Sequence, residues 1–186
     1  MVGVSQAGGR KAVFLDRDGV IVVPEVRDGR SFAPVRLQDY RFYPEAAAAL
    51  SRLKAAGYLL VVVTNQPEVG RGLIPEEVLA EMHRRLLASL PVDSIKVCRH
   101  TAADGCDCRK PKPGMLVASA SELGISLPDS YMVGDRASDV EAGSAAGCRT
   151  VFIDLGYTGE PKPESASFTV SSISQAADII LAPTPT

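Results

Sequence analysis

The stretch AVFLDRDG at residues 12–19 joins a short apolar run to a pair of acidic side chains, Asp16 and Asp18. The apolar part, Ala12 to Leu15, does not alternate with polar residues, which predicts a strand buried on both faces, as in a parallel sheet. The run Leu59 to Val63 has the same character and predicts a second such strand. Ligands of open α/β sheets bind beyond the carboxyl ends of the strands, so the polar residues after each run are the first candidates for a functional site.

Strand-like and helix-like segments alternate along the rest of the chain. Further strands are predicted at 93–97, 131–133, 150–153 and 168–170, and helices at 44–56, 75–90, 113–123, 138–146 and 175–181. This alternation predicts a single α/β domain with an open, mainly parallel sheet sandwiched by helices. Residues 22–40, rich in charge, proline and glycine, are expected to form a long loop or small flap near the sheet edge. Residues 1–9 and 182–186 are expected to be loose ends.

Length and composition limit the class of protein. The 186 residues carry a formal charge of -2 and include no tryptophan. This size suits one domain, taking about 150 residues per domain as a guide, and the charge balance disfavours a nucleic-acid partner. No run approaches the ~20 apolar residues of a membrane span. Because Met1 to Arg10 also lacks the apolar core of a signal peptide, we expect a soluble, cytoplasmic protein. We also expect it to act as a monomer.

Three predicted strands end in side chains suited to phosphate chemistry. They are Asp16 and Asp18 after the first strand, Thr64 after the second, and Asp135 after the strand at 131–133. Crowded carboxylates repel one another unless a cation neutralises them, and oxygen ligands with an open side suit Mg²⁺. A carboxylate can also attack phosphorus to form an aspartyl-phosphate, and Asp18 could protonate the leaving oxygen and later activate water.

A basic segment, Arg109-Lys110-Pro111-Lys112-Pro113, precedes a predicted helix and could reach the same edge of the sheet. Lys110 and the Thr64 hydroxyl would neutralise and orient a transferring phosphoryl group, where positioning and charge supply most of the catalysis. Asp-x-Asp-Gly alone is equally typical of an ordinary turn after a strand. The four elements together, each after a strand or before a helix, favour a phosphoryl-transfer site.

The chain resembles the haloacid dehalogenase superfamily of phosphohydrolases at four motifs. The matching segments are Asp16-Arg17-Asp18-Gly19, Thr64-Asn65-Gln66, Lys110-Pro111 and Gly134-Asp135-Arg136-Ala137-Ser138-Asp139. The resemblance spans residues 12 to about 155 and implies a Mg²⁺-dependent phosphatase with the haloacid dehalogenase-like fold. It implies Asp16 as the nucleophile and Asp18 as the general acid/base.

The same resemblance implies the metal and phosphate ligands. Mg²⁺ would be held by the Asp16 and Asp135 carboxylates and by the Asp18 backbone carbonyl. Thr64 and Lys110 would bind the phosphoryl group, and Asp139 would support Lys110 or the metal from behind; these roles are carried over residue by residue. Val20 departs from the pattern, since many relatives have threonine there.

A second group of metal-ligand residues lies in one short loop. It consists of Cys98, His100, Cys106 and Cys108. Three thiolates and one imidazole are the ligand set of a closed tetrahedral zinc site, which leaves no position for a reactive water. We therefore predict a structural Zn²⁺ that fixes the loop before Arg109 and Lys110. Two unrelated pairs of polar loop residues, or a Cys-x-Cys redox pair, are the alternatives.

The segment Cys-x-His…Cys-Asp-Cys-Arg-Lys-Pro is similar to the zinc-loop phosphatases that act on D-glycero-D-manno-heptose 1,7-bisphosphate and on histidinol phosphate. Those enzymes lack a large cap, and this chain leaves no room for an independent one of ~50 residues between its motifs. The resemblance implies a small phosphorylated sugar as substrate, with removal of the heptose 7-phosphate favoured. Histidinol phosphate or another small sugar phosphate is the alternative.

Candidate substrate ligands follow Thr64 and the cysteine loop. They are Asn65, Gln66, Arg71 and Arg109. Arg71 and Arg109 would hold a second, non-reacting phosphate bidentately, although Arg71 is also compatible with an ordinary exposed arginine. Glu68 departs from the heptose phosphatase pattern and could repel such a phosphate.

Other interpretations assign the chain to different classes. A non-catalytic zinc module that binds a protein would leave the aspartates at the strand ends unexplained. A nucleic-acid 3′-phosphatase would need a basic, aromatic-lined groove, which the composition disfavours. Cys148 is expected to be a small buried residue, and His83, on a charged helix face, is expected to be exposed to solvent.

Overall fold

The protein, described here by a computed structural model over residues 9–183, alternates strands and helices along the chain. The strands are β1 (Ala12–Leu15), β2 (Glu25–Arg27), β3 (Arg30–Phe32), β4 (Leu59–Asn65), β5 (Ser94–Cys98), β6 (Tyr131–Gly134), β7 (Arg149–Ile153) and β8 (Phe168–Val170). The helices are α1 (Ala46–Ala55), α2 (Pro67–Gly70), α3 (Glu76–Ser89), α4 (Gly114–Leu123), α5 (Ala137–Ala146) and α6 (Ile173–Leu181). The loose ends predicted at 1–9 and 182–186 lie outside the described residues, except for residues 9, 182 and 183.

Six strands form one parallel sheet in the order β5-β4-β1-β6-β7-β8. At its centre Phe14 of β1 pairs with Val61 of β4 on one side and with Met132 of β6 on the other. The prediction of an open, mainly parallel sheet is confirmed, and every predicted strand and helix matches an observed one to within two residues at each end. The site-bearing loops after β1, β4 and β6 therefore lie side by side.

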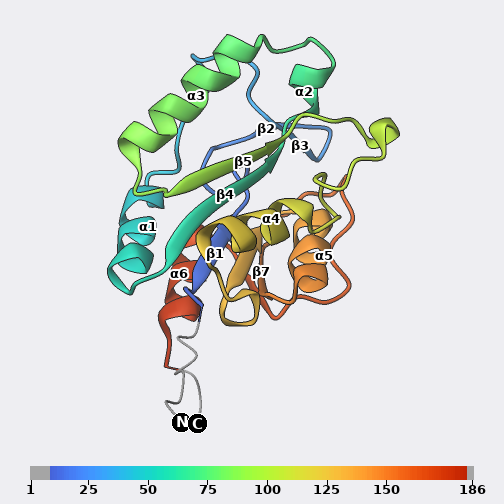
Figure 1. Ribbon diagram of the computed structural model, residues 1–186. Coiled ribbons are helices and arrows are strands. Elements are labelled where there is room, and N and C mark those ends of the chain that lie inside the picture. Colours follow the sequence, from blue (N-terminus) through green and yellow to red (C-terminus); the bar gives the residue numbers. More distant parts are fainter. Residues whose placement is uncertain (1–8, 184–186) are drawn as a thin grey trace, which may run out of the picture.

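The sheet is covered by helices on both faces, with α4 and α5 on one side and α1 and α6 on the other (Figure 1). Successive β1 side chains enter different cores: Val13 and Leu15 join α1, α3 and α6, whereas Ala12 and Phe14 join α4 and α5. All four are fully buried. Burial on both faces explains why the strand lacks polar alternation.

The segment predicted as a loop or flap contains a short antiparallel hairpin, β2–β3. Nη2 of Arg136, in the loop after β6, donates to the Ser31 carbonyl at 2.6 Å and to its hydroxyl at 2.7 Å. The Ser31 amide in turn donates to Oε1 of Glu160 at 2.7 Å. The hairpin is thus attached to two loops at the carboxyl ends of the parallel strands.

Among the helices of residues 9–183, none combines the length and apolar character that crossing a membrane requires.

Candidate active site

A cavity of about 490 Å³ opens at the carboxyl ends of β1, β4 and β6. Its lining includes most of the predicted site residues together with part of the hairpin: Asp16, Asp18, Phe32, Thr64, Asn65, Glu68, Arg71, Arg109, Lys110, Arg136 and Asp139. A second hollow of about 540 Å³, beside Tyr58 and Tyr131 at the opposite end of the sheet, contains none of them. The chemistry predicted from four distant motifs therefore converges on one cavity.

Lys110 joins two of these carboxylates. Its Nζ lies 2.7 Å from Oδ1 of Asp16 and 2.6 Å from Oδ1 of Asp139, and it donates to the Val63 carbonyl at 2.8 Å. Burial alone would lower the pKa of Lys110, but the carboxylates of Asp139 and Asp16 raise it above its usual value. Lys110 therefore stays a cation inside the protein, facing the predicted nucleophile.

Asp135 is the least compensated charge of the site. It is 2% exposed, and neither carboxylate oxygen has a hydrogen-bond partner among the described residues. Burial, with Asp16 and Asp139 close by, raises the pKa of Asp135 well above its usual value. Oxygens of Asp16, Asp135 and Asp139 all lie within 4.8 Å of one another. This donor set fits a hard divalent cation, which would neutralise Asp135 and use its free oxygens.

Gly19 allows this crowding. It adopts a φ of +94°, and a Cβ at this position would lie 2.0 Å from Oδ2 of Asp135. Only a residue without a side chain permits the loop after β1 to approach Asp135 so closely. The glycine of Asp16-Arg17-Asp18-Gly19 thus has a steric role at the site.

The residues after β4 support their neighbours. The Asn65 amide clamps the Lys110 backbone, donating to its carbonyl at 3.0 Å and accepting from its N–H at 3.2 Å. Nε2 of Gln66 donates to Oδ2 of Asp18 at 2.8 Å and to the Thr64 hydroxyl at 3.1 Å. Gln66 is fully buried and does not line the cavity, whereas Thr64 and Asn65 do.

Asp18 is held apart from the other carboxylates by Arg17. Nη2 of Arg17 lies 2.8 Å from Oδ2 of Asp18, and Nη1 lies 3.2 Å from Nε2 of His83. The prediction that His83 is exposed to solvent is wrong, because the residue is half-buried and its ring contacts Arg17 from α3. Charged neighbours along a helix indicate a solvated face on average, and the sequence carries no local signal for this single inward residue. Cys148, by contrast, is buried as predicted.

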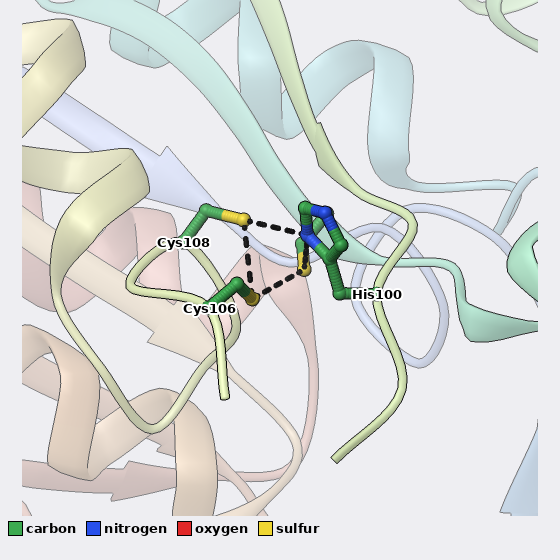
Figure 2. A group of neighbouring side chains, drawn as sticks. His100, Cys106 and Cys108 are labelled. Atoms are coloured by element: carbon green, nitrogen blue, oxygen red, sulfur yellow. Dashed lines mark hydrogen bonds between the residues drawn. The ribbon is translucent and has the colours of Figure 1, made fainter. Parts of the chain in front are cut away.

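The cysteine loop brings its four predicted ligands together (Figure 2). The Sγ atoms of Cys98 and Cys106 are 3.7 Å apart, those of Cys106 and Cys108 are 3.4 Å apart, and Nδ1 of His100 lies 3.3 Å from Sγ of Cys108. A tetrahedron with metal–sulfur bonds of about 2.3 Å has sulfur–sulfur edges of roughly 3.7 Å. Soft ligands at these separations fit a closed zinc site.

Two arginines and one glutamate border the open side of the cavity. Nη1 of Arg109 donates to the His100 carbonyl at 3.1 Å, which ties this arginine to the cysteine loop. Arg71 follows the short helix α2, whose Gly70 packs closely against the backbone of Arg99. Glu68 also lines the cavity, and its Oε2 atom is buried without a hydrogen-bond partner among the described residues.

The sequence did not identify the contribution of the hairpin. Phe32, which is 38% exposed, and Arg136 both line the cavity. Arg136 lies inside the motif Gly134-Asp135-Arg136-Ala137-Ser138-Asp139, and its position directly after Asp135 was a signal that it lies near the site. Nothing near Phe32 in the sequence indicates that it faces the site.

Comparisons with known proteins agree with this geometry. A family model described as HAD-hydrolase-like matches residues 107–176. A Vibrio cholerae protein named D-glycero-beta-D-manno-heptose-1,7-bisphosphate 7-phosphatase is 41% identical over 169 residues, covering 83% of this chain and 86% of that protein. A Pseudomonas aeruginosa protein of the same name is 37% identical over 164 residues, covering 83% and 89%.

A solved structure extends the similarity to three dimensions. It is the D,D-heptose 1,7-bisphosphate phosphatase from B. bronchiseptica, complexed with magnesium and phosphate. The two chains share 30% sequence identity with a TM-score of 0.76, and the match covers 92% of this chain and 98% of the other. The fold is therefore shared with an enzyme whose structure holds magnesium and phosphate.

Proposed function

Since this chain belongs to the haloacid dehalogenase-like phosphatases, in the family of the heptose-1,7-bisphosphate 7-phosphatases, we propose that it removes the 7-phosphate of D-glycero-D-manno-heptose 1,7-bisphosphate. One observation carries the chemistry: the buried Lys110 lies between Asp16 and Asp139, beside an Asp135 whose two oxygens have no partner. This combination places a nucleophilic carboxylate on the cavity and a cation site directly beside it, at the buried Asp135.

Asp16 and Asp135 would hold Mg²⁺ with their carboxylates, with the Asp18 carbonyl as a further ligand. When bound, the ion supplies positive charge that neutralises these carboxylates and offsets the negative charge of a substrate phosphate. Asp139 instead holds Lys110 in place. Its pKa is raised to about 6, because burial outweighs the opposing effect of Lys110.

The first chemical step is attack of an Asp16 carboxylate oxygen on the phosphorus of the phosphomonoester. The bond from phosphorus to the sugar oxygen breaks, and Asp18 gives a proton to that oxygen as it leaves. Lys110 and the Thr64 hydroxyl stabilise the charge on the transferring group. The products are an aspartyl-phosphate on Asp16 and the free sugar hydroxyl.

The second step returns the enzyme to its starting state. Asp18, now a carboxylate, accepts a proton from a water molecule that attacks the phosphorus of the aspartyl-phosphate. The bond from phosphorus to Asp16 breaks, inorganic phosphate is released, and Asp18 is again protonated. Each residue is regenerated, so the cycle consumes only the phosphomonoester and one water molecule.

Substrate choice depends on the rim of the cavity. Arg71 and Arg109 would bind the second phosphate of a bisphosphate, since guanidinium groups bind phosphate bidentately. Phe32 offers an apolar surface for the sugar ring. A structural Zn²⁺ on the cysteine cluster would hold Arg109 in position through the contact between Arg109 and the His100 carbonyl.

Histidinol phosphate is a second candidate substrate, favoured by Glu68. A carboxylate with an unpartnered oxygen at the cavity wall suits an ammonium group better than a second phosphate. The two candidates therefore make opposite predictions for Glu68→Gln. Loss of this negative charge raises activity towards a bisphosphate and lowers activity towards an amino alcohol phosphate.

The test is phosphate release with Mg²⁺ from both heptose bisphosphate anomers, histidinol phosphate and common hexose bisphosphates, for the unmodified protein and Glu68→Gln. The highest kcat/KM for a heptose bisphosphate, with a sugar 1-phosphate as product, supports the proposal. Preference for histidinol phosphate over every bisphosphate would overturn the substrate. Full activity of Asp16→Asn on an aryl phosphate would overturn the nucleophile.

A further inference from the structure

The guanidinium of Arg17 is a buried charge placed directly between the two mechanistic aspartates in the sequence. Arg17 is 0% exposed, and its cation lies 5.5 Å from the centre of the Tyr40 ring. Its Nε and Nη2 donate to Asp18, Nη2 also donates to Oε1 of Gln66 at 2.9 Å, and Nη1 meets His83. A fully buried cation needs such partners, and they fix its orientation.

The two oxygens of Asp18 are held unequally. Oδ2 receives Nη2 of Arg17 and Nε2 of Gln66, both at 2.8 Å, and shares the Nε–H of Arg17 at 3.1 Å. Oδ1 receives only that shared Nε–H, also at 3.1 Å. A proton on Oδ2 would face two donors, whereas Oδ1 keeps lone pairs free. Since Asp18 lines the cavity, Oδ1 is the oxygen suited to exchange a proton with the leaving group.

His83 holds the far side of Arg17. Arginine has donors and no acceptor, so Nε2 of His83 must accept the hydrogen bond and the proton of the neutral ring sits on Nδ1. Burial, with further effects of Arg17 and Arg99, lowers the pKa of His83 to about 4, which keeps the ring neutral near pH 7. His83 itself does not line the cavity.

We propose that His83 is a positioning residue for the phosphatase reaction: through Arg17 it orients Asp18 so that Oδ1 faces the leaving oxygen. The inference rests on the proposed role of Asp18 as general acid. It assigns to α3, which contributes no group to the cavity, a specific effect on proton transfer.

A purely structural role for His83 makes a different prediction. If the ring only satisfied a buried arginine, its loss would affect all substrates alike through stability. If the ring positions Asp18, its removal lowers activity mainly towards substrates whose leaving group needs a proton. An alkoxide must be protonated as it leaves, whereas 4-nitrophenolate is a stable anion that leaves without help.

The experiment compares His83→Leu and His83→Gln with the unmodified, Mg²⁺-loaded protein. The Oε1 atom of glutamine can replace Nε2 as acceptor, and leucine cannot. For each protein, kcat/KM is measured with a sugar phosphate and with 4-nitrophenyl phosphate, since kcat/KM reports the first phosphoryl transfer. The quantity compared between variants is the ratio of the two kcat/KM values. Arg84→Leu, at an exposed position of the same helix, is the matched control.

We expect His83→Leu to lose about ten-fold in kcat/KM on the sugar phosphate and less than about two-fold on the aryl phosphate. A ten-fold loss is only part of the 10²–10⁴-fold that a general acid contributes, because Asp18 itself remains. His83→Gln should recover most of the loss, and Arg84→Leu should show none. Equal losses on both substrates, or no loss in a folded His83→Leu, would overturn the inference. If His83→Leu does not fold, His83→Ala takes its place in the same comparison of sugar phosphate and aryl phosphate, and the same two outcomes decide.

Failure of the proposed function has a separate signature. In that case the unmodified protein itself releases no phosphate from any substrate, and the positioning role of His83 is rejected together with the proposed function. If the unmodified protein is active and only the ratio in His83→Leu is unchanged, the phosphatase assignment stands and the positioning role alone is rejected.

Discussion

The ammonium group of Lys110 lies 2.7 Å from Oδ1 of Asp16, although 94 positions separate the two residues in the sequence. Because Lys110 also contacts Asp139 and the Val63 carbonyl, all three of its N–H donors are used inside the protein. One buried cation therefore contacts two carboxylates, and both the charge of the site and part of the stability of the fold depend on it.

Replacing this cation should damage both properties. Lys110→Met leaves Asp16 and Asp139 without their cation, so we expect loss of measurable phosphate release and destabilisation by about 3–5 kcal/mol. Urea unfolding gives the stability and an aryl phosphate assay the activity. Lys112→Met removes an exposed ion pair with Asp107 and should cost about 1 kcal/mol or less. Similar losses in the two variants would contradict the central role of Lys110.

Adding one methyl group at Gly19 should disturb the cation site. In Gly19→Ala the new Cβ meets Oδ2 of Asp135, and the φ of +94° strains the backbone. We expect apparent Mg²⁺ affinity to weaken about ten-fold and kcat to fall about 100-fold, as in other misplaced active sites. Mg²⁺ titrations of activity and thermal stability measure both effects.

Gly124→Ala is the control for the backbone part of this effect. Gly124 also has a positive φ, of +65°, but a Cβ there meets nothing within 4 Å. It should cost about 1 kcal/mol of stability and leave Mg²⁺ affinity unchanged. Normal Mg²⁺ binding by Gly19→Ala would show that Asp135 is not a ligand.

Acid should weaken the fold partly through His83. Its pKa is about 4 in the folded protein, below the value of about 6.5 expected when unfolded. Between pH 6.5 and 4 the unfolded chain binds a proton there that the folded chain does not, so this contribution to stability is lost as pH falls. Allowing for partial exposure of the ring, we expect about 1–2 kcal/mol.

Urea unfolding at pH 7 and pH 4.5 measures this difference. His83→Gln has no titratable group at this position, so its stability should decline less over the same interval. The carboxylates titrate alike in both proteins and cancel in the comparison. An identical decline in the two proteins would mean that His83 is not held neutral by the fold.

Removal of the metal from the cysteine loop should weaken substrate binding more than turnover. Cys106→Ser breaks the proposed tetrahedral set, so we expect less than one zinc per chain by elemental analysis and a Tm lower by roughly 5 °C or more. Arg109 is tied to His100, so KM for a bisphosphate should rise several-fold with kcat less affected. Cys148→Ser, at a buried cysteine outside the cluster, should keep its zinc.

Sequence patterns predicted the layers of the fold because strands buried on both faces consist of uninterrupted apolar runs. β1 and β4 are apolar on both faces, and both lie in the middle of the sheet. The hairpin β2–β3 leaves no such trace, because each strand has three residues and its attachment comes from Arg136 and Glu160, more than a hundred positions away. The four-residue helix α2 was likewise too short to show a period.

The candidate site shows the same division. Asp16, Asp135 and the cysteine cluster were recognisable because their chemistry needs particular residue types after particular strands. The burial of Arg17 and the inward position of His83 were not, since each depends on partners from another element. Local charge patterns predict the average exposure of a helix face. They do not predict a single buried polar contact between elements that are distant in sequence.

The attachment of Ser31 to both Arg136 and Glu160 fastens this part of the cavity wall to the loops that follow the parallel strands. Ser31 is fastened while the neighbouring Phe32 remains free to vary, so exchanges at that tip can alter the molecules admitted without disturbing hydrolysis. One element that shapes selectivity thus lies on a stretch of chain separate from the reacting residues, and it can diversify while they are preserved.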